Sequence, residues 1–164
     1  MTAIQNGNLD KLAKALVNCD PNFVDESSGE TPLSIASSLS ISNSTIQQQI
    51  IVAIVNGGAL LDFRTKDGRT SLHVAVQKSN FIALKTLLDL GASPNYPDTN
   101  GLTPLYYSVI HKANPKLTQL LLYEHASLGV TDQHGWQEIH HVRNIYFSNY
   151  LLVINVINFF FKIN

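Results

Sequence analysis

One short pattern recurs along the chain and constrains its fold more than any other feature of the sequence. A glycine stands two residues before a Thr, or before the residue in the equivalent place, at Gly29, Gly68, Gly101 and Gly135. The spacings are 39, 33 and 34 residues, and the strings that follow are GETPLSIA, GRTSLHVA, GLTPLYYS and GWQEIHHV. A period of this length predicts a solenoid of stacked units, because one unit alone is too small to bury its apolar face.

Each copy also contains a leucine-rich stretch that ends in GA, or a near equivalent, and leads into a turn. The copies read VNCDPNFV from Val17, NGGALLDF from Asn56, LGASPNYP from Leu90 and EHASLGVT from Glu124. A period near 33 that combines T-P-L-H with L-L-x-x-G-A-x-P-N is the ankyrin signature. We therefore predict an all-α ankyrin-repeat solenoid, built of helix pairs joined by hairpin-like turns.

Residues at fixed places in the pattern fit the beginnings of short helices. Thr31, Thr70 and Thr103 stand at N-cap positions, where a side-chain hydroxyl can accept a backbone N–H. Pro32 and Pro104 follow at the first helical position, where a missing N–H costs nothing. The sequence thus predicts where the first helix of each of these repeats begins.

The remaining positions predict the core and the ends of the helices. Residues 81–90 form a helix that is apolar on one face, at Leu84, Leu87 and Leu88, and Gly91 should end it in the left-handed conformation. His73 should tie neighbouring repeats together by a hydrogen bond. The residues expected to point inward from the first helices are Leu33, Leu72, Leu105 and Ile139.

We divide the chain into residues 1–140, a partial ankyrin array, and residues 141–164, an apolar tail. The array is expected to be truncated at both ends: residues 3–17 read as the end of one repeat, two complete repeats and a fourth with an atypical end follow, and a fifth begins at Gly135. The second repeat is longer than the others, and its extra residues, Ser37 to Thr45, are placed in the loop between its two helices.

The tail has three interpretations. Fifteen of its 24 residues are Val, Ile, Leu, Phe or Tyr, five are Asn, and none is acidic. The codons of Val142, Arg143 and Asn144 can contain a splice-donor sequence, so the tail could be translated intron. It could instead be a helix that caps the open end of the array, or a membrane anchor through residues 145–161.

Composition argues against several classes of function. The net charge is -1 with 14 % charged residues, which gives no basic field for nucleic-acid binding. Cys19 is the only cysteine, and the chain has no zinc-ligand spacing, no signal peptide, no phosphate-binding loop and no hydrolase motif. We therefore expect no enzyme activity, no cofactor, no metal and a cytoplasmic location.

The positions that the repeat leaves free define a candidate site. Ankyrin arrays bind proteins through their hairpin tips and first helices, and the tip residues here change from acidic to basic to apolar and aromatic along the array. They are Ser27, Ser28 and Glu30; Lys66, Asp67 and Arg69; Thr99, Asn100 and Leu102; and Gln133, His134 and Trp136.

Two features of this candidate site stay open from the sequence alone. Trp136 can be a binding anchor, since Trp is enriched at hot spots, or it can pack on Tyr106 or Tyr107 of the neighbouring repeat. Arg64 joins Lys66 and Arg69 in a small basic cluster, which is either a binding feature or a solvated face.

Several stretches go beyond the general ankyrin pattern and resemble the ankyrin-repeat region of the Shank family of postsynaptic scaffold proteins over residues 3–140. They include LDFRT within NGGALLDFRT and GWQEIH from Gly135. The resemblance implies a protein-interaction module at the postsynaptic density. It also implies partners such as the family's N-terminal ubiquitin-like domain, the spectrin relative fodrin, and Sharpin. The alternatives are a tail-anchored membrane adaptor and a mis-spliced fragment without a role of its own.

Overall fold

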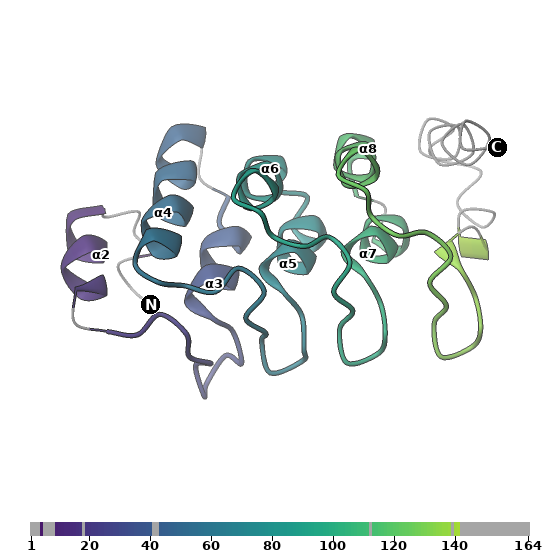
Figure 1. Cartoon of the computed structure of the whole chain (residues 1–164), viewed down its shortest axis with the longest axis horizontal. Coiled ribbons are helices and arrows are strands. Elements are labelled where there is room, and N and C mark those ends of the chain that lie inside the picture. Colours follow the sequence, from purple (N-terminus) through teal and green to yellow (C-terminus); the bar gives the residue numbers. More distant parts are fainter. Residues whose placement is uncertain are drawn as a thin grey trace.

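The computed structural model describes residues 4, 9–17, 19–40, 43–111, 113–138 and 140–141. Within them the chain forms two rows of short helices with a series of loops that project to one side (Figure 1). An inner row next to the loops contains α3, α5 and α7, and an outer row contains α4, α6 and α8. The helices are α2 (Leu9–Leu16), α3 (Pro32–Ser38), α4 (Ser44–Asn56), α5 (Ser71–Gln77), α6 (Phe81–Asp89), α7 (Pro104–Ile110) and α8 (Pro115–Tyr123). The predicted all-α ankyrin solenoid is confirmed.

The helices α3, α6 and α7 show the capping and stop residues that the sequence predicts. The hydroxyl of Thr31 accepts the backbone N–H of Ser34 at 3.0 Å, and Thr103 caps α7 in the same way. Pro32 and Pro104 occupy the first turns of α3 and α7. Gly91 has a φ of 97°, in the left-handed region that suits glycine after a helix.

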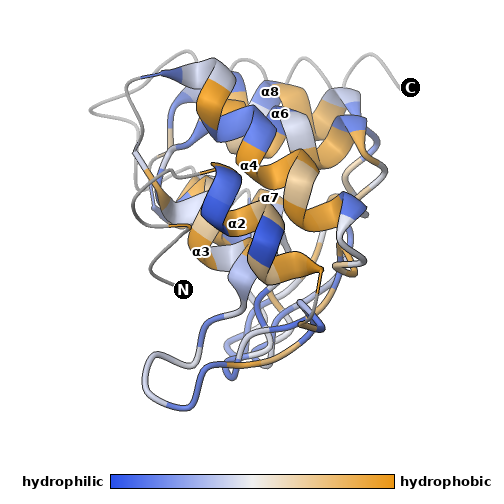
Figure 2. Cartoon of the chain, turned by 90° about the vertical axis from the view of Figure 1, so that its left-hand side faces the viewer, coloured by the Kyte–Doolittle hydropathy of each residue, from blue (hydrophilic) through white to orange (hydrophobic). Residues whose placement is uncertain are grey.

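The core runs along the array between the two rows of helices. Its fully buried side chains include Ile54, Leu84, Leu87 and Leu117, which the outer helices α4, α6 and α8 direct toward the inner row. The projecting loops are mainly hydrophilic, whereas the apolar residues gather in the helices (Figure 2). Each outer helix packs against the next, α4 on α6 and α6 on α8, so the stability of one repeat depends on its neighbours.

The extra residues of the long repeat mostly extend a helix, which corrects the prediction that they form a loop. Helix α4 has 13 residues, whereas α6 has 9. Four of the six extra residues therefore lengthen α4, and only two lie between α3 and α4. Asn43 makes this possible, because its side chain accepts the backbone N–H groups of Thr45 and Ile46 and so caps α4 at its N-terminus.

Asparagine side chains join the turns that follow the outer helices. Asn22 donates to the carbonyl of Gly58 at 2.9 Å and accepts from the backbone N–H of Leu60 at 2.8 Å. Asn95 makes the same two bonds to the turn of the repeat that follows it, at 3.3 and 2.6 Å. Each of these amides therefore satisfies one donor and one acceptor of the neighbouring backbone.

Asp62 occupies the equivalent position in the repeat between Asn22 and Asn95, and it can make only one of the two hydrogen bonds. It accepts from the backbone N–H of Ser93 at 3.3 Å, but a carboxylate has no N–H to offer the carbonyl of Gly91. Burial raises the pKa of Asp62, while the Ser93 bond and Arg64 oppose the shift. The ionised carboxyl is therefore a destabilising feature of this turn.

Replacing Asp62 by Asn should stabilise the array by about 1 kcal/mol at neutral pH, because the amide supplies the missing donor. The pKa of Asp62 is higher in the folded state than in the unfolded state, so the parent loses stability as the pH rises through the folded pKa. In acid, where Asp62 is protonated, the advantage of the Asp62→Asn variant over the parent should disappear. Thermal unfolding at neutral and acidic pH measures both effects. If Asp62→Asn is less stable than the parent, the residue does not make the two backbone hydrogen bonds that Asn22 and Asn95 make. The matched control is Asp89→Asn, on the exposed surface of a helix.

Residues 142–164 lie outside the described part of the chain, and so does Ile139. The three interpretations of the tail therefore stay predictions. In the described part, no helix reaches the length and apolar character that crossing a membrane requires.

Candidate partner-binding surface

The projecting loops are four fingers that are closed by the same backbone hydrogen bond. They span residues 25–30, 65–69, 98–102 and 132–136, and in each the first residue donates its backbone N–H to the carbonyl of the last at 2.8–2.9 Å. A glycine near the tip has a positive φ in every finger. At Gly68 an added Cβ would lie 2.7 Å from a carbon of the Thr99 side chain, so both the conformation and the space require glycine there.

The side chain that begins a finger holds the loop closed. Asp98 accepts the backbone N–H groups of Asn100 and Leu102 at 2.8 and 2.9 Å. Asp132 does the same for the last finger, and the hydrogen bond from the Trp136 backbone is the main reason that the pKa of Asp132 lies well below its usual range. In the first finger, hydrogen bonds from the hydroxyl groups of Ser27 and Ser28 lower the pKa of Asp25 to about 2.

Hydrogen bonds also join each finger to the next. The backbone N–H of Lys66 donates to Gly29 at 2.8 Å, and the hydroxyl of Thr99 donates to the carbonyl of Asp67 at 2.8 Å. The amide of Gln133 donates to the side-chain oxygen of Asn100 at 3.0 Å. The four fingers thus form one continuous strip, which we call the finger strip.

His73 ties two repeats together, as the sequence predicts. Its Nδ1 accepts the backbone N–H of Thr70 at 3.0 Å, so its Nε2 carries the proton and donates to the carbonyl of Leu102 at 2.9 Å. Burial lowers the pKa of His73 to about 4, and the ring is neutral at physiological pH. In the next repeat Tyr106 fills the same place, because its hydroxyl donates to the carbonyl of Trp136 at 3.1 Å.

The second repeat has Ser34 in this place, and serine is too short to reach the following finger. Its hydroxyl bonds instead to Glu30 at 2.6 Å. An ion pair between Glu30 and Arg69, 3.0 Å apart with side chains 24 % and 16 % exposed, joins the two repeats in place of the histidine bond. Arg69 also contacts Asp67 at 3.1 Å and Gln77 at 2.7 Å.

The predicted basic cluster is consequently divided among different environments. Arg69 is paired with two carboxylates. Arg64 donates to the carbonyl of Pro97 at 2.9 Å and lies over the ring of Tyr96, 5.6 Å from its centroid. Lys66 is exposed at the finger, so of the three cations it is the one best placed to meet a partner.

The structure brings the other predicted residues together on the finger strip. Leu102 is half-buried, like Glu30 and Arg69. Those that are exposed are Ser27, Ser28, Lys66, Asp67, Thr99, Asn100, Gln133, His134 and Trp136. A hollow of about 200 Å³ between the last two fingers is lined by Asn100, Leu102, Asp132, Gln133 and His134.

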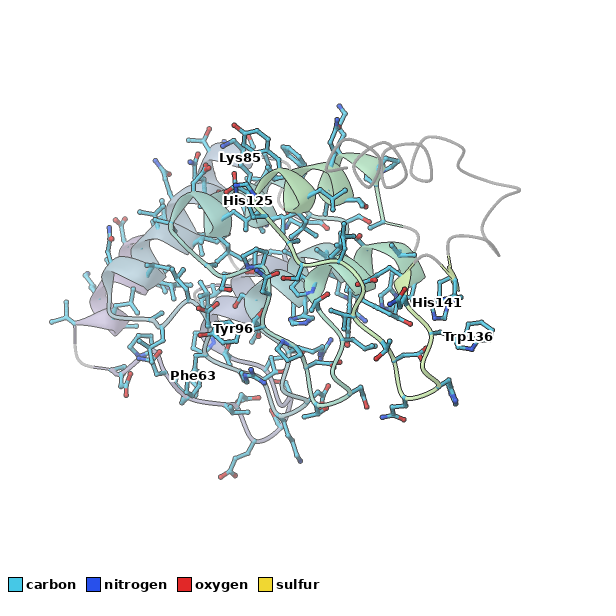
Figure 3. All side chains as sticks on the ribbon, turned by 45° about the vertical axis from the view of Figure 1, so that its right-hand side comes forward. Phe63, Lys85, Tyr96, His125, Trp136 and His141 are labelled. Carbon is cyan, nitrogen blue, oxygen red and sulfur yellow. The ribbon has the colours of Figure 1, made fainter. Side chains whose placement is uncertain are left out.

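Trp136 stands at the end of the strip with 46 % of its surface exposed. Figure 3 shows Trp136 next to His141. The centroid of the Trp136 ring lies 5.4 Å from that of the His141 ring and 6.4 Å from that of the His140 ring. The hydrogen bond from the Tyr106 hydroxyl ends on the backbone carbonyl of Trp136 and does not involve the indole. The surface therefore has an accessible aromatic side chain on an anchored backbone.

Sequence reasoning missed the buried polar contacts that support the fingers. Tyr107 donates to Asp98 at 2.8 Å, and burial followed by this bond raises the pKa of Tyr107 well above its usual value. Tyr106 also donates to Asp132 at 2.9 Å. A tyrosine in the histidine place of T-P-L-H was the signal that could have indicated the second contact. The described residues contain no group of three side chains suited to hold a metal ion.

Comparison with known proteins agrees with this architecture. The model of the family described as ankyrin repeats (3 copies) matches residues 1–98 and 40–132. The chain belongs to the ankyrin-repeat family. It is 50 % identical over 141 residues, 85 % of its length, to human SH3 and multiple ankyrin repeat domains protein 2. It is 46 % identical over 138 residues to mouse SH3 and multiple ankyrin repeat domains protein 1.

The resemblance to the Shank family is thereby confirmed. The chain spans 7 % of the length of the human relative and 6 % of that of the mouse relative. It is also 36 % identical over 80 residues to chicken inversin, a more distant similarity. The family supports a protein-interaction module of the kind that scaffolds contain.

Proposed function

We propose that this chain is a protein-binding module of a Shank-like scaffold, and that its partner lies along the finger strip and the adjoining inner helices. The observation that carries the proposal is the hydrogen bonding of every finger within itself and to its neighbour. A strip held in this way is ordered before a partner arrives, so binding costs little conformational entropy. The side chains of Lys66, His134 and Trp136 are exposed on it.

The resemblance supports specific partners as well as the general function. An N-terminal ubiquitin-like domain of the same family, a spectrin-type segment such as that of fodrin, or Sharpin would bind here, at the postsynaptic density. The proposed module binds without catalysis and without a cofactor. Its exposed tips mix both charges with amides and one indole, which favours a folded protein surface over a nucleic acid.

Replacing Trp136 by Ala should weaken binding by about 2 kcal/mol or more, mainly through faster dissociation, if the indole is a hot spot. Surface plasmon resonance with a Shank-type N-terminal domain supplied in trans measures this. Replacing Lys66 by Glu should mainly slow association at low salt, because an exposed charge at the rim acts through steering.

The control is Leu60→Ala, an exposed apolar residue outside the finger strip. Equal kinetics for Trp136→Ala, Lys66→Glu and Leu60→Ala would exclude the finger strip as the binding surface for this domain. Circular dichroism of each variant separates lost binding from lost folding. An unfolded Trp136→Ala variant would show that the indole serves packing between repeats.

A further inference from the structure

The outer row of helices has an apolar surface of its own, far from the fingers. Phe81, Leu120 and Tyr123 border a hollow of about 400 Å³ together with Lys116 and Gln119. Phe81 and Leu120 are partly buried against the core, whereas Tyr123 is 75 % exposed. These residues belong to α6 and α8, and the inner row separates both helices from the fingers (Figure 1).

The fold does not require these three apolar side chains. When α4, α6 and α8 are aligned on the pair of residues equivalent to Gly91 and Ala92, each of the three stands where its two counterparts are polar or smaller. The counterparts are Gln48 and Pro115 for Phe81, Ala53 and Thr86 for Leu120, and Asn56 and Asp89 for Tyr123. Large apolar side chains therefore occur here although the equivalent positions of the other repeats lack them. On the border of an exposed hollow, such side chains indicate contact with another molecule.

The charged residues that line the hollow and its neighbour are lysines. A second hollow, of about 350 Å³, shares Phe81 and is lined also by Lys78. Among the described residues that line the two hollows none is acidic, and Lys116 and Lys78 stand at their borders. The N-terminal ends of α6 and α8 add positive partial charge. Asp89, the counterpart of Tyr123 at the C-terminal end of α6, is paired with Lys85 at 2.7 Å.

We propose that this surface, the outer trough formed by Phe81, Leu120 and Tyr123 with Lys78 and Lys116 at its border, binds an acidic amphipathic helix of a partner protein. The apolar face of the helix would fill the hollow, and its carboxylates would lie near the two lysines. A membrane fits less well, because it favours a convex face with more cations and this face is hollowed. Since the trough and the finger strip lie on opposite sides of the array, one chain can hold two proteins at once.

The test uses the full chain and a fluorescein-labelled helical peptide with a leucine stripe flanked by glutamates. Fluorescence anisotropy should show saturable binding of this peptide. A peptide with the same leucines flanked by lysines should bind at least about tenfold more weakly. Flotation with vesicles of phosphatidylcholine and phosphatidylserine should give the same result for the chain and for its Tyr123→Asp variant, because the trough does not bind the membrane.

Tyr123→Asp and Leu120→Thr introduce residues that the equivalent places of α6 already carry, so both variants should fold. Each should weaken binding of the glutamate peptide about tenfold or more. Leu60→Asp, which places the same charge on an exposed apolar residue elsewhere, should leave it unchanged. The proposal is overturned if the peptide does not saturate, if the lysine peptide binds equally well, or if Tyr123→Asp and Leu120→Thr keep the parent affinity. It is also overturned if Tyr123→Asp lowers the retention of the chain on vesicles.

Discussion

Replacing Leu87 by Ala should lower the free energy of unfolding by about 2–5 kcal/mol, the cost of truncating a fully buried leucine. Leu87 has no exposed surface and lies in α6, which packs against α4 on one side and α8 on the other. Because each repeat is stabilised mainly through its neighbours, a cavity in α6 weakens the array in both directions. Urea unfolding followed by helical circular dichroism measures the loss.

Lys85→Ala is the matched control for this prediction. Lys85 lies on the same helix with 53 % of its side chain exposed, and its pair with Asp89 is a surface pair. The control should change stability by no more than about 0.5 kcal/mol. A Leu87→Ala variant with the same urea midpoint as the parent would show that Leu87 does not belong to the core.

The sequence was sufficient for the caps of α3 and α7, the end of α6 and the core position of Leu87, which depend on local chemistry repeated at a fixed spacing. The caps at Thr31 and Thr103, the prolines after them and the glycine at Gly91 each satisfy a requirement of a few neighbouring residues. The core position of Leu87 follows from helical periodicity. His73 could be assigned to the next repeat because its place in T-P-L-H fixes its distance from that repeat's backbone.

The features that the sequence did not predict arise where one repeat has a different residue from its neighbours at an equivalent position. Ser34 ends too early to reach the following finger, and this gap is filled by Glu30 and Arg69, which are 39 residues apart. The extra residues before Thr45 look like a polar loop, but Asn43 caps a longer helix there. Trp136 lies on the last finger, and the contact of its indole with His141, at the edge of the described chain, was not predicted.

The finger strip and the outer trough, on the two sides of the array, depend on different physical interactions. The finger strip is polar and owes its order to hydrogen bonds within and between the loops. The outer trough is apolar and exists because three residues depart from their counterparts in the other repeats. Changes on one side should therefore leave binding on the other side intact, which makes the two proposals independently testable.

Replacing Arg69 by Glu should destabilise the array by roughly 2–3 kcal/mol, because charged hydrogen bonds are lost and a third carboxylate is placed beside Glu30 and Asp67. The guanidinium lies 3.0 and 3.1 Å from these two groups. Part of the penalty is repulsion between partly exposed charges, so it should shrink as salt is added. Urea unfolding of the variant at low and high ionic strength measures both terms.

Lys66→Glu makes the same change of charge three residues away in the same finger, at an exposed side chain. It should cost no more than about 0.5 kcal/mol. The charge swap Glu30→Arg with Arg69→Glu should recover part of the stability, since it restores one attractive pair. If Arg69→Glu and Lys66→Glu are equally stable, Arg69 does not join the two repeats. Arg69 would then be free to meet a partner, and slower association of Arg69→Glu with the N-terminal domain would assign it to the rim of the binding surface.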